Sequence, residues 1–325
     1  MSGTLLSVSN LSVSFKTDDA FFTAVDDVSF DIHRGEVVGL VGESGCGKSV
    51  SALSLLRLIP SPPGKIENGR VLFKGRDLLK AEIETLRKIR GAEIGMIFQE
   101  PLSALSPLQR IGRQMVETLR IHRDTAKSSA WEISLDWLGK VNIPDAAEKM
   151  HAYPFQLSGG MQQRIMIAMA LMMNPDLIIA DEPTTALDVT IQAQIFQLIR
   201  EMKKEHTSIL LITHDMGVVW EMCDRVMVMY ASRIVEEGSM EEIFSAPLHP
   251  YTHSLLKSIP ALSDGRGKRL AVIPGSVPSP ENYPSGCRFR VRCPFAFERC
   301  RKEAPELIPV SNGRRAACFI AGQFR

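Results

Sequence analysis

Residues 42–49 are Gly42-Glu43-Ser44-Gly45-Cys46-Gly47-Lys48-Ser49, which is a complete G-x-x-x-x-G-K-S loop. The strand-like run 36–41 comes directly before this loop, and the helix-like stretch 51–59 follows it. In such a loop, backbone N–H groups surround phosphate oxygens, Lys48 reaches the β- and γ-phosphates, and the Ser49 hydroxyl can ligate Mg²⁺. The stretch therefore predicts an α/β fold that binds a nucleoside triphosphate through this loop and the adjoining Val50. The weaker alternative is a glycine-rich turn that binds nothing, and we interpret Cys46 as a small filler.

An acidic pair follows a second apolar strand. Residues 177–180 are Leu-Ile-Ile-Ala, and Asp181 and Glu182 come next. Asp181 would hold Mg²⁺ through its water shell, and Glu182 could polarise the water that attacks the γ-phosphate. An Asp-Glu pair after a strand is often only the start of a helix. In a chain that also has the phosphate-binding loop of residues 42–49, which we call the P-loop, the pair predicts the catalytic carboxylates.

Residues 157–164, Leu-Ser-Gly-Gly-Met-Gln-Gln-Arg, open an apolar helix that includes residues 165–173. Ser158 is a good N-cap, and Gly159 and Gly160 leave bare N–H groups at the positive end of the helix dipole. This turn is a second predicted anion site. The turn and the P-loop of one subunit cannot both hold the same γ-phosphate if they face in different directions. We therefore expect a dimer in which ATP lies between the P-loop of one subunit and the helix end of the other.

The overall composition is that of an ordinary globular protein. Of the 325 residues, 45% are hydrophobic and 23% are charged, and 38 Lys and Arg against 37 Asp and Glu leave a net charge of +1. This balance favours neither nucleic acid nor an acidic partner. The longest purely apolar run, 165–173, is well below the roughly 20 residues needed to span a bilayer. The N-terminus lacks the pattern of a secretory signal, so we expect a cytoplasmic protein.

Prolines mark the domain organisation. Ten of the nineteen prolines lie between Pro247 and Pro309, spaced too closely for long helices. We therefore expect a main domain of residues 1–250 and an extension of residues 251–325. From about residue 106 to 157 the strand signals vanish, which predicts a helical insertion. Short apolar runs predict the buried parallel strands of the core: 36–41, 176–180 and 208–213.

Taken together, the P-loop and the stretch 157–164 give the chain a resemblance to the nucleotide-binding subunits of ATP-binding cassette (ABC) transporters, where the latter stretch is the signature motif. The resemblance implies a P-loop NTPase fold with a RecA-like core and a helical subdomain at about residues 106–157. It also implies that ATP and Mg²⁺ bind, and that Gln163 of the signature stretch belongs to the nucleotide site.

Further residues match this family in order along the chain. Gln99 matches the loop glutamine that touches Mg²⁺ and faces the membrane subunits. Asp188 matches the loop that lines the dimer seam, and His214 matches the switch histidine at the γ-phosphate. The family also stacks adenine on an aromatic side chain near the first strand, for which Phe15 is the first candidate and Phe22 the second; a core Phe15 is the alternative.

Within the ABC family, the chain resembles one particular group of ATPase subunits. The stretches 98–107 and 249–260 and the cysteine-bearing tail are similar to the ATPase subunits of dipeptide and oligopeptide permeases. This implies a second, related ATPase subunit as a heterodimer partner, two transmembrane permease subunits, an extracytoplasmic substrate-binding protein, and a peripheral location on the cytoplasmic face of the membrane. Importers of nickel, glutathione and antimicrobial peptides share much of the pattern, so the cargo stays open.

Four of the six cysteines, Cys287, Cys293, Cys300 and Cys318, lie in the last 39 residues. Disulfides are unfavourable in a reducing compartment, so the alternatives are an iron–sulfur cluster, a zinc site or buried thiols. The spacing lacks the short C-x₂₋₄-C knuckles of zinc sites. Residues 287–302 include six basic residues and one acidic residue, which gives a local net charge of +5. This charge would offset the negative charge of a four-thiolate cluster. The resemblance implies a [4Fe–4S] cluster at this position.

Two other functional classes compete with a transporter subunit. A soluble ABC ATPase that acts on nucleic acid or ribosomes generally carries two cassettes or large insertions, whereas this chain has one cassette and no base-reading motif, so we expect no nucleic acid. A regulatory module that binds ATP without turnover is disfavoured by the intact Glu182 and His214.

Overall fold

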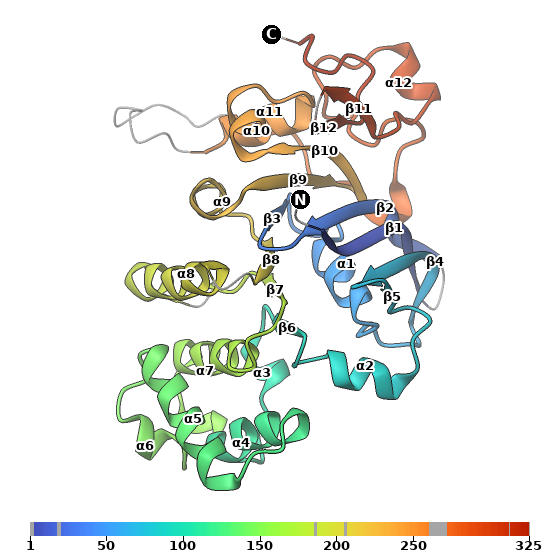
Figure 1. Ribbon diagram of the computed structural model, residues 1–325. Helices are drawn as coiled ribbons and strands as arrows, with labels where there is room; N and C mark the ends of the chain where they lie inside the picture. The colour runs from blue at the N-terminus through green and yellow to red at the C-terminus, as the bar shows by residue number, and fades with distance from the viewer. Residues whose placement is uncertain are drawn as a thin grey trace. The chain divides into compact units, whose positions relative to one another are not determined.

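The computed structural model describes residues 3–17, 21–184, 187–204, 207–259, 272–311 and 313–324 (Figure 1). The chain forms two compact units. The first, which we call the signature unit, contains His33–Val37 and Ala81–Leu211. The second, the P-loop unit, contains Thr4–Ile32, Val38–Lys80 and Ile212–Arg325. We describe each unit by itself.

The signature unit has a small core of largely buried strands. These are β6 (Ile94–Ile97), β7 (Leu177–Asp181) and β8 (Ser208–Ile212), with β7 between the other two. β6 and β7 are parallel, and Ile97 pairs with Ala180. All five residues of β7 and of β8 are buried, as expected for strands that are covered on both faces.

Helices make up most of the rest of this unit. Their bounds are α2 (Ile83–Ile89), α3 (Pro101–Ala104), α4 (Ile111–His122), α5 (Lys127–Lys140), α6 (Ala146–Lys149), the 3₁₀ turn η1 (Pro154–Gln156), α7 (Gly159–Leu171) and α8 (Val189–Lys204). Figure 1 shows α4, α5 and α6 gathered beside α7. The absence of strand signals between residues 106 and 157 therefore correctly predicted helices, and α4 buries Ile111, Met115 and Leu119 at helical spacing.

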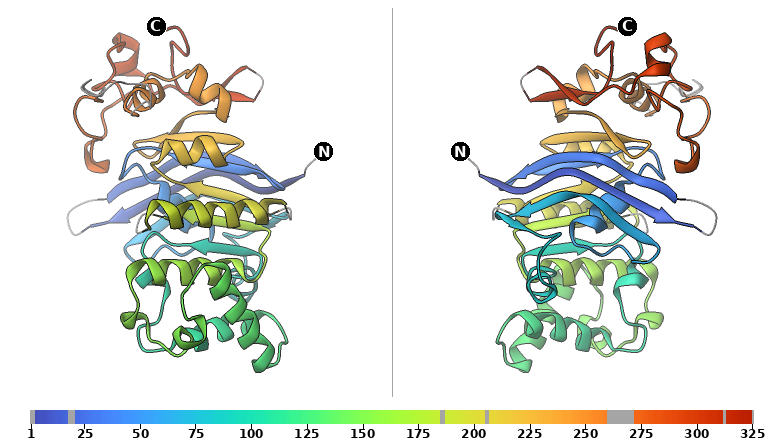
Figure 2. Two further views of the ribbon diagram at one scale, coloured as in Figure 1. Left: turned by 90° about the vertical axis from the view of Figure 1, so that its left-hand side faces the viewer. Right: turned by 90° about the vertical axis from the view of Figure 1, so that its right-hand side faces the viewer.

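The P-loop unit begins with a four-stranded antiparallel sheet. Its order is β2 (Phe21–His33), β1 (Thr4–Lys16), β4 (Gly64–Phe73) and β5 (Arg76–Asp77). β1 and β4 pair along most of their length, from Leu6 opposite Phe73 to Phe15 opposite Gly64. Figure 2 shows the long β1 and β2 strands side by side. No pattern in the sequence had predicted this sheet.

The P-loop itself lies between a buried strand and a helix, as predicted. β3 (Val37–Val41) precedes it and α1 (Lys48–Leu55) follows it. β3 is parallel to β9 (Arg225–Tyr230), and Val41 pairs with Val228. β9 then turns back into the antiparallel β10 (Arg233–Ser239). Three helices flank these strands: α9 (Met216–Met222), α10 (Met240–Ser245) and α11 (Pro250–Lys257).

The sequence predicts a small, irregular C-terminal extension, and the structure shows short elements within it. It contains the 3₁₀ turn η2 (Pro280–Asn282), α12 (Glu298–Lys302), β11 (Ile308–Ser311) and β12 (Arg314–Ala316). β12 pairs with β10, with Ala316 opposite Glu236, so the extension continues a sheet of the P-loop unit. The density of prolines correctly predicted that long helices are absent from the described part of the extension. It could not predict β12, a three-residue strand whose partner β10 lies far away in the sequence.

An aromatic cluster packs the extension against the rest of the P-loop unit. Phe289, 1% exposed, has its ring centroid 5.2 Å from that of Tyr230 and 5.4 Å from that of Tyr251. Both tyrosines are fully buried, and their own rings lie 4.6 Å apart. Figure 2 shows the red C-terminal part of the extension beside the orange α11. Among the residues that the structure describes, no helix is long and apolar enough to cross a membrane.

Candidate functional site

The P-loop has a shape that its glycines make possible. Gly47 has φ +105°, and a Cβ added there would collide with the carbonyl oxygen of Ala24. A Cβ at Gly42 would collide with the carbonyl oxygen of Met229. The loop is therefore held closely against β2 and β9, and a side chain at either glycine would force it away from them.

Lys48 lies inside the loop rather than in solvent. It is 6% exposed, and its Nζ donates to the carbonyl oxygens of Gly42 at 2.7 Å and Glu43 at 3.0 Å. Cys46 is completely buried, and burial raises the pKa of its thiol. This agrees with our interpretation of Cys46 as a filler, because a protonated buried thiol is unreactive. Ser44 and Gly45 are exposed at the tip of the loop.

Two further predicted residues belong to the same unit. His214 follows β8 and is exposed, and the next residue, Asp215, caps α9 by accepting from the N–H groups of Gly217 and Val218. Phe15 is half-buried and stacks on Phe22, with ring centroids 5.6 Å apart and planes 16° apart. The two adenine candidates thus form one stacked pair. That either ring contacts adenine stays a prediction.

The acidic pair and Gln99 meet in the signature unit. Gln99 comes shortly after β6 and Glu182 directly after β7, and because these strands are parallel neighbours, both residues leave the sheet at the same edge. The Gln99 amide donates from Nε2 to Glu182 Oε2 at 3.3 Å. Asp181 is the last residue of β7 and is 4% exposed. Glu182 has φ +47°, so the chain turns sharply between the two carboxylates.

The signature helix, α7, has the predicted cap, and Asp188 caps α8. Ser158 accepts from the N–H of Met161 at 3.3 Å, and Ser158 and Gly159 are exposed at the start of α7. Asp188 accepts from the N–H of Ile191 at 3.0 Å at the start of α8.

Gln163 is buried, unlike the exposed signature residues Ser158 and Gly159. It is completely buried, and its Nε2 donates to the carbonyl oxygen of Pro183 at 2.6 Å. This contact supports the turn that carries Glu182, whereas a direct contact of Gln163 with nucleotide stays a prediction.

The predicted nucleotide residues therefore fall into two groups. Lys48, Ser49, Phe15 and His214 belong to the P-loop unit with the rest of the loop, whereas Gln99, Asp181, Glu182, Asp188 and the signature residues belong to the signature unit. Each group has the chemistry expected of it: the first supplies a cation and backbone N–H groups for phosphate, and the second supplies carboxylates and an amide next to one another.

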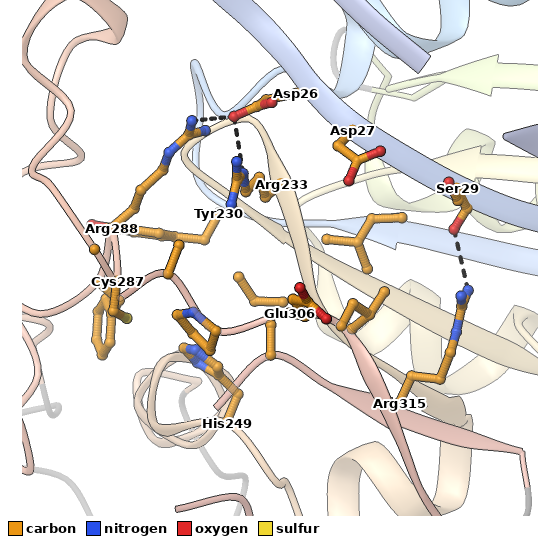
Figure 3. Close-up of a pocket in the computed structure, with 18 residues that line it drawn as sticks. Asp26, Asp27, Ser29, Tyr230, Arg233, His249, Cys287, Arg288, Glu306 and Arg315 are labelled. Carbon is orange, nitrogen blue, oxygen red and sulfur yellow. Dashed lines mark hydrogen bonds and ion pairs between the residues drawn. The ribbon is translucent and has the colours of Figure 1, made fainter. Parts of the chain in front are cut away.

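The four tail cysteines line one small apolar cavity. Cys287, Cys293, Cys300 and Cys318 share its wall with three phenylalanines, and its volume is about 20 Å³. Burial, with a smaller contribution from the neighbouring thiols, raises the pKa of Cys287 and of Cys318 to about 11. Cys287 also lines a larger cavity of about 400 Å³, where Figure 3 shows it near His249.

In the described part of the chain, no group of three or more His, Cys, Asp or Glu side chains has an arrangement that could hold a metal ion as it stands. The chemistry of the donor set nevertheless fits, because four thiols face a common apolar space. The structure thus brings the predicted ligands together without showing that they bind metal.

Two residues that contact the P-loop were missed by our sequence analysis. Tyr251 Oη accepts from the backbone N–H of Glu43 at 3.0 Å, and Arg292 forms an ion pair with the Glu43 carboxylate. We had counted Arg292 only as part of the basic charge of the tail. No sequence pattern links residues so far apart in the chain.

Two family models match the chain: "ABC transporter" over residues 25–185, and "Oligopeptide/dipeptide transporter, C-terminal region" over residues 235–300. The second match includes Cys287, Cys293 and Cys300 but ends before Cys318.

The chain is similar to curated proteins over nearly its whole length. A probable peptide ABC transporter ATP-binding protein of Sinorhizobium fredii is 49% identical, with 98% of this chain and 96% of the relative covered. The dipeptide transport ATP-binding protein DppD of Escherichia coli is 47% identical, with 97% and 96% covered. Among solved structures, a dimeric ATP-binding cassette bound to ADP and Pi is 27% identical with a TM-score of 0.66, covering 72% of this chain and 98% of that one.

The close approach of the P-loop to β2 makes a specific prediction. Gly47→Ala places a Cβ against the Ala24 carbonyl oxygen and on an unfavourable φ, so we expect ATP binding to weaken by at least about 100-fold in a folded protein. Equilibrium binding of a fluorescent ATP analogue measures this loss. Gly139→Ala, in α5 with open space around it, is the matched control and should bind as the wild type does. Normal binding by Gly47→Ala would show that the loop tolerates this displacement.

Proposed function

The chain belongs to the ABC transporter family of ATP-binding proteins, and on this premise we propose that it hydrolyses ATP to drive the import of dipeptides or oligopeptides. The observation that supports the proposal is the extent of the sequence similarity to peptide-transport proteins. It runs through the cassette and continues into the C-terminal region at 47–49% identity to proteins named for peptide and dipeptide transport. A nucleotide-binding cassette alone would not distinguish peptide import from other ABC functions.

The proposed ATPase roles follow from the chemistry of the two residue groups. The N–H groups of the P-loop and Lys48 bind the phosphates, as the buried position of Lys48 within the loop supports. Glu182 accepts a proton from the attacking water, and the Gln99 amide beside it orients its carboxylate. His214 donates a hydrogen bond to the γ-phosphate as negative charge develops on the phosphate oxygens.

Ser49, Asp181 and Gln99 are the residues proposed to hold Mg²⁺. Their hydroxyl, carboxylate and amide oxygens are the hard ligands that Mg²⁺ prefers. When bound, the ion neutralises charge on the β- and γ-phosphates. Since Gln99 donates to Glu182 through its nitrogen, its carbonyl oxygen is the atom proposed to face the ion.

We propose that the active form contains two ATPase subunits. The exposed Ser158 and Gly159 at the start of α7 would complete the site of the neighbouring subunit, with Gly160 and Asp188 beside them. A related but different ATPase is the proposed neighbour. Two transmembrane permease subunits and an extracytoplasmic substrate-binding protein complete the proposed importer, with this chain on the cytoplasmic face of the membrane.

We further propose that the tail carries a [4Fe–4S] cluster. The support is the convergence of Cys287, Cys293, Cys300 and Cys318 on one cavity, together with the local charge of +5 around them. The thiols must lose their protons on binding, so loading releases protons. The role proposed for the cluster is structural, because a bound group would join the loop of Cys287 and Cys293, the helix α12 and the segment after β12.

Glu182→Gln tests the ATPase and its coupling to transport. The substitution removes the base and keeps the shape, so ATP should bind normally while turnover falls by at least about 100-fold. In vesicles that contain the permease subunits, peptide uptake should stop together with hydrolysis. Lys48→Ala is the comparison, and it should lose ATP binding as well. Uptake of peptide by the Glu182→Gln complex at the normal rate would separate this ATPase from peptide import.

Anaerobic purification tests the proposed cluster. We expect brown protein with broad visible absorbance and about four irons per chain, because four thiolates ligate one cluster. Cys293→Ala should lose the colour, and Cys223→Ala, which changes a buried cysteine outside the tail, should keep it. Colourless protein that contains stoichiometric zinc, or no metal, would rule out the cluster.

A further inference from the structure

Glu43, the second residue of the P-loop, is held by an arginine of the cysteine-bearing tail. Arg292 Nη1 donates to Glu43 Oε1 at 2.9 Å, and Nη2 donates to Oε2 at 3.0 Å, which makes the pair bidentate. The side chain of Arg292 is 4% exposed and that of Glu43 is 28% exposed. A paired geometry of this kind fixes both the position and the charge of the carboxylate.

The guanidinium of Arg292 is itself fixed by its surroundings. Its Nε donates to the carbonyl oxygen of Pro274 at 2.9 Å, and the group lies over the Tyr230 ring at 5.7 Å from the centroid. The backbone N–H of Arg292 donates to the carbonyl oxygen of Phe289, the residue at the centre of the aromatic cluster. The packing of the tail therefore determines where the guanidinium lies.

Each polar group of Glu43 has a separate partner. Its carboxylate pairs with Arg292, its backbone N–H donates to Tyr251 Oη at 3.0 Å, and its carbonyl oxygen accepts from Lys48 Nζ at 3.0 Å. Glu43 thus connects the phosphate-binding lysine to two parts of the chain beyond residue 250. All of these residues belong to the P-loop unit.

We propose that Arg292 is a positioning residue for nucleotide binding: it holds and neutralises the Glu43 carboxylate, so that the P-loop receives a polyphosphate without a repelling charge beside it. Without Arg292, the carboxylate would be left next to a loop that must accept a highly charged anion. Its repulsion grows with the charge of the ligand. The loss of affinity should therefore be larger for ATP than for ADP, which a general disturbance of the fold would not produce.

The proposal requires ATP binding at the P-loop, but it does not require a peptide cargo or a cluster in the tail. Its failure would leave the proposed import function untouched, and failure of peptide import would leave the role of Arg292 untouched.

The test is equilibrium binding of ATP and ADP to the purified full-length chain. Arg292→Met should lower the affinity for ATP about tenfold and the affinity for ADP less, because one buried charge partner is lost. Adding Glu43→Gln to this variant should restore most of the affinity, since the amide does not repel phosphate and Tyr251 still binds the backbone. Arg292→Lys, which keeps the charge but not the bidentate geometry, should lie between the wild type and Arg292→Met.

Arg288→Met is the matched control. Arg288 lies in the same tail and forms a half-buried ion pair, but its partner is Asp26 on β2, which it shares with Arg233 (Figure 3). This variant should lower the melting temperature and keep its ATP affinity within about twofold of wild type, since its partner is outside the P-loop.

Three results would overturn the proposal. These are normal ATP affinity in Arg292→Met, an equal loss for ATP and ADP that Glu43→Gln does not reverse, or an equal loss in Arg288→Met. If Arg292→Met does not fold, Arg292→Lys decides the question, and wild-type ATP affinity in that variant would also contradict the proposal.

Discussion

The close packing of the P-loop against neighbouring backbone is the constraint on which the rest of the site depends. The carbonyl oxygens of Ala24 and Met229 leave no room for a Cβ at Gly47 and Gly42, so β2 and β9 set the path of the loop. That path puts Lys48 among the loop carbonyls and buries Cys46 beneath them. The extension adds a further support through the side chains that hold Glu43. The nucleotide loop is thus determined by residues from most of the P-loop unit.

Local sequence patterns were enough to predict the strand, loop and helix around Lys48, the capped helix that starts after Ser158, and the helical region between β6 and β7. Each of these is encoded within about 20 consecutive residues, by periodicity, a cap or a glycine. The proximity of Gln99 and Glu182 could also have been predicted, because each residue follows the carboxyl end of a strand and the two strands are parallel neighbours.

The missed features depend on pairings across long stretches of the chain. These features are the sheet that contains β1, β2 and β4, the pairing of β12 with β10, and the ion pair between Glu43 and Arg292. Each joins segments whose sequences contain no pattern that would indicate their pairing. Gln163 illustrates a related difficulty. Its position in the signature stretch predicts a nucleotide contact, which stays a prediction. The sequence did not indicate that Gln163 is buried and supports the turn after β7 through its bond to Pro183.

The central claim is that this chain forms one half of an ATPase pair in which each nucleotide is enclosed by both subunits. The most direct measurement uses Ser158→Arg in this chain, combined with a wild-type partner ATPase and the membrane subunits, and assigns nucleotide occupancy and turnover to each P-loop. The account predicts that the partner's P-loop site stops hydrolysing while nucleotide still binds at Lys48 of the altered chain. Loss of nucleotide from the altered chain's own P-loop, with the partner's site unaffected, would contradict it.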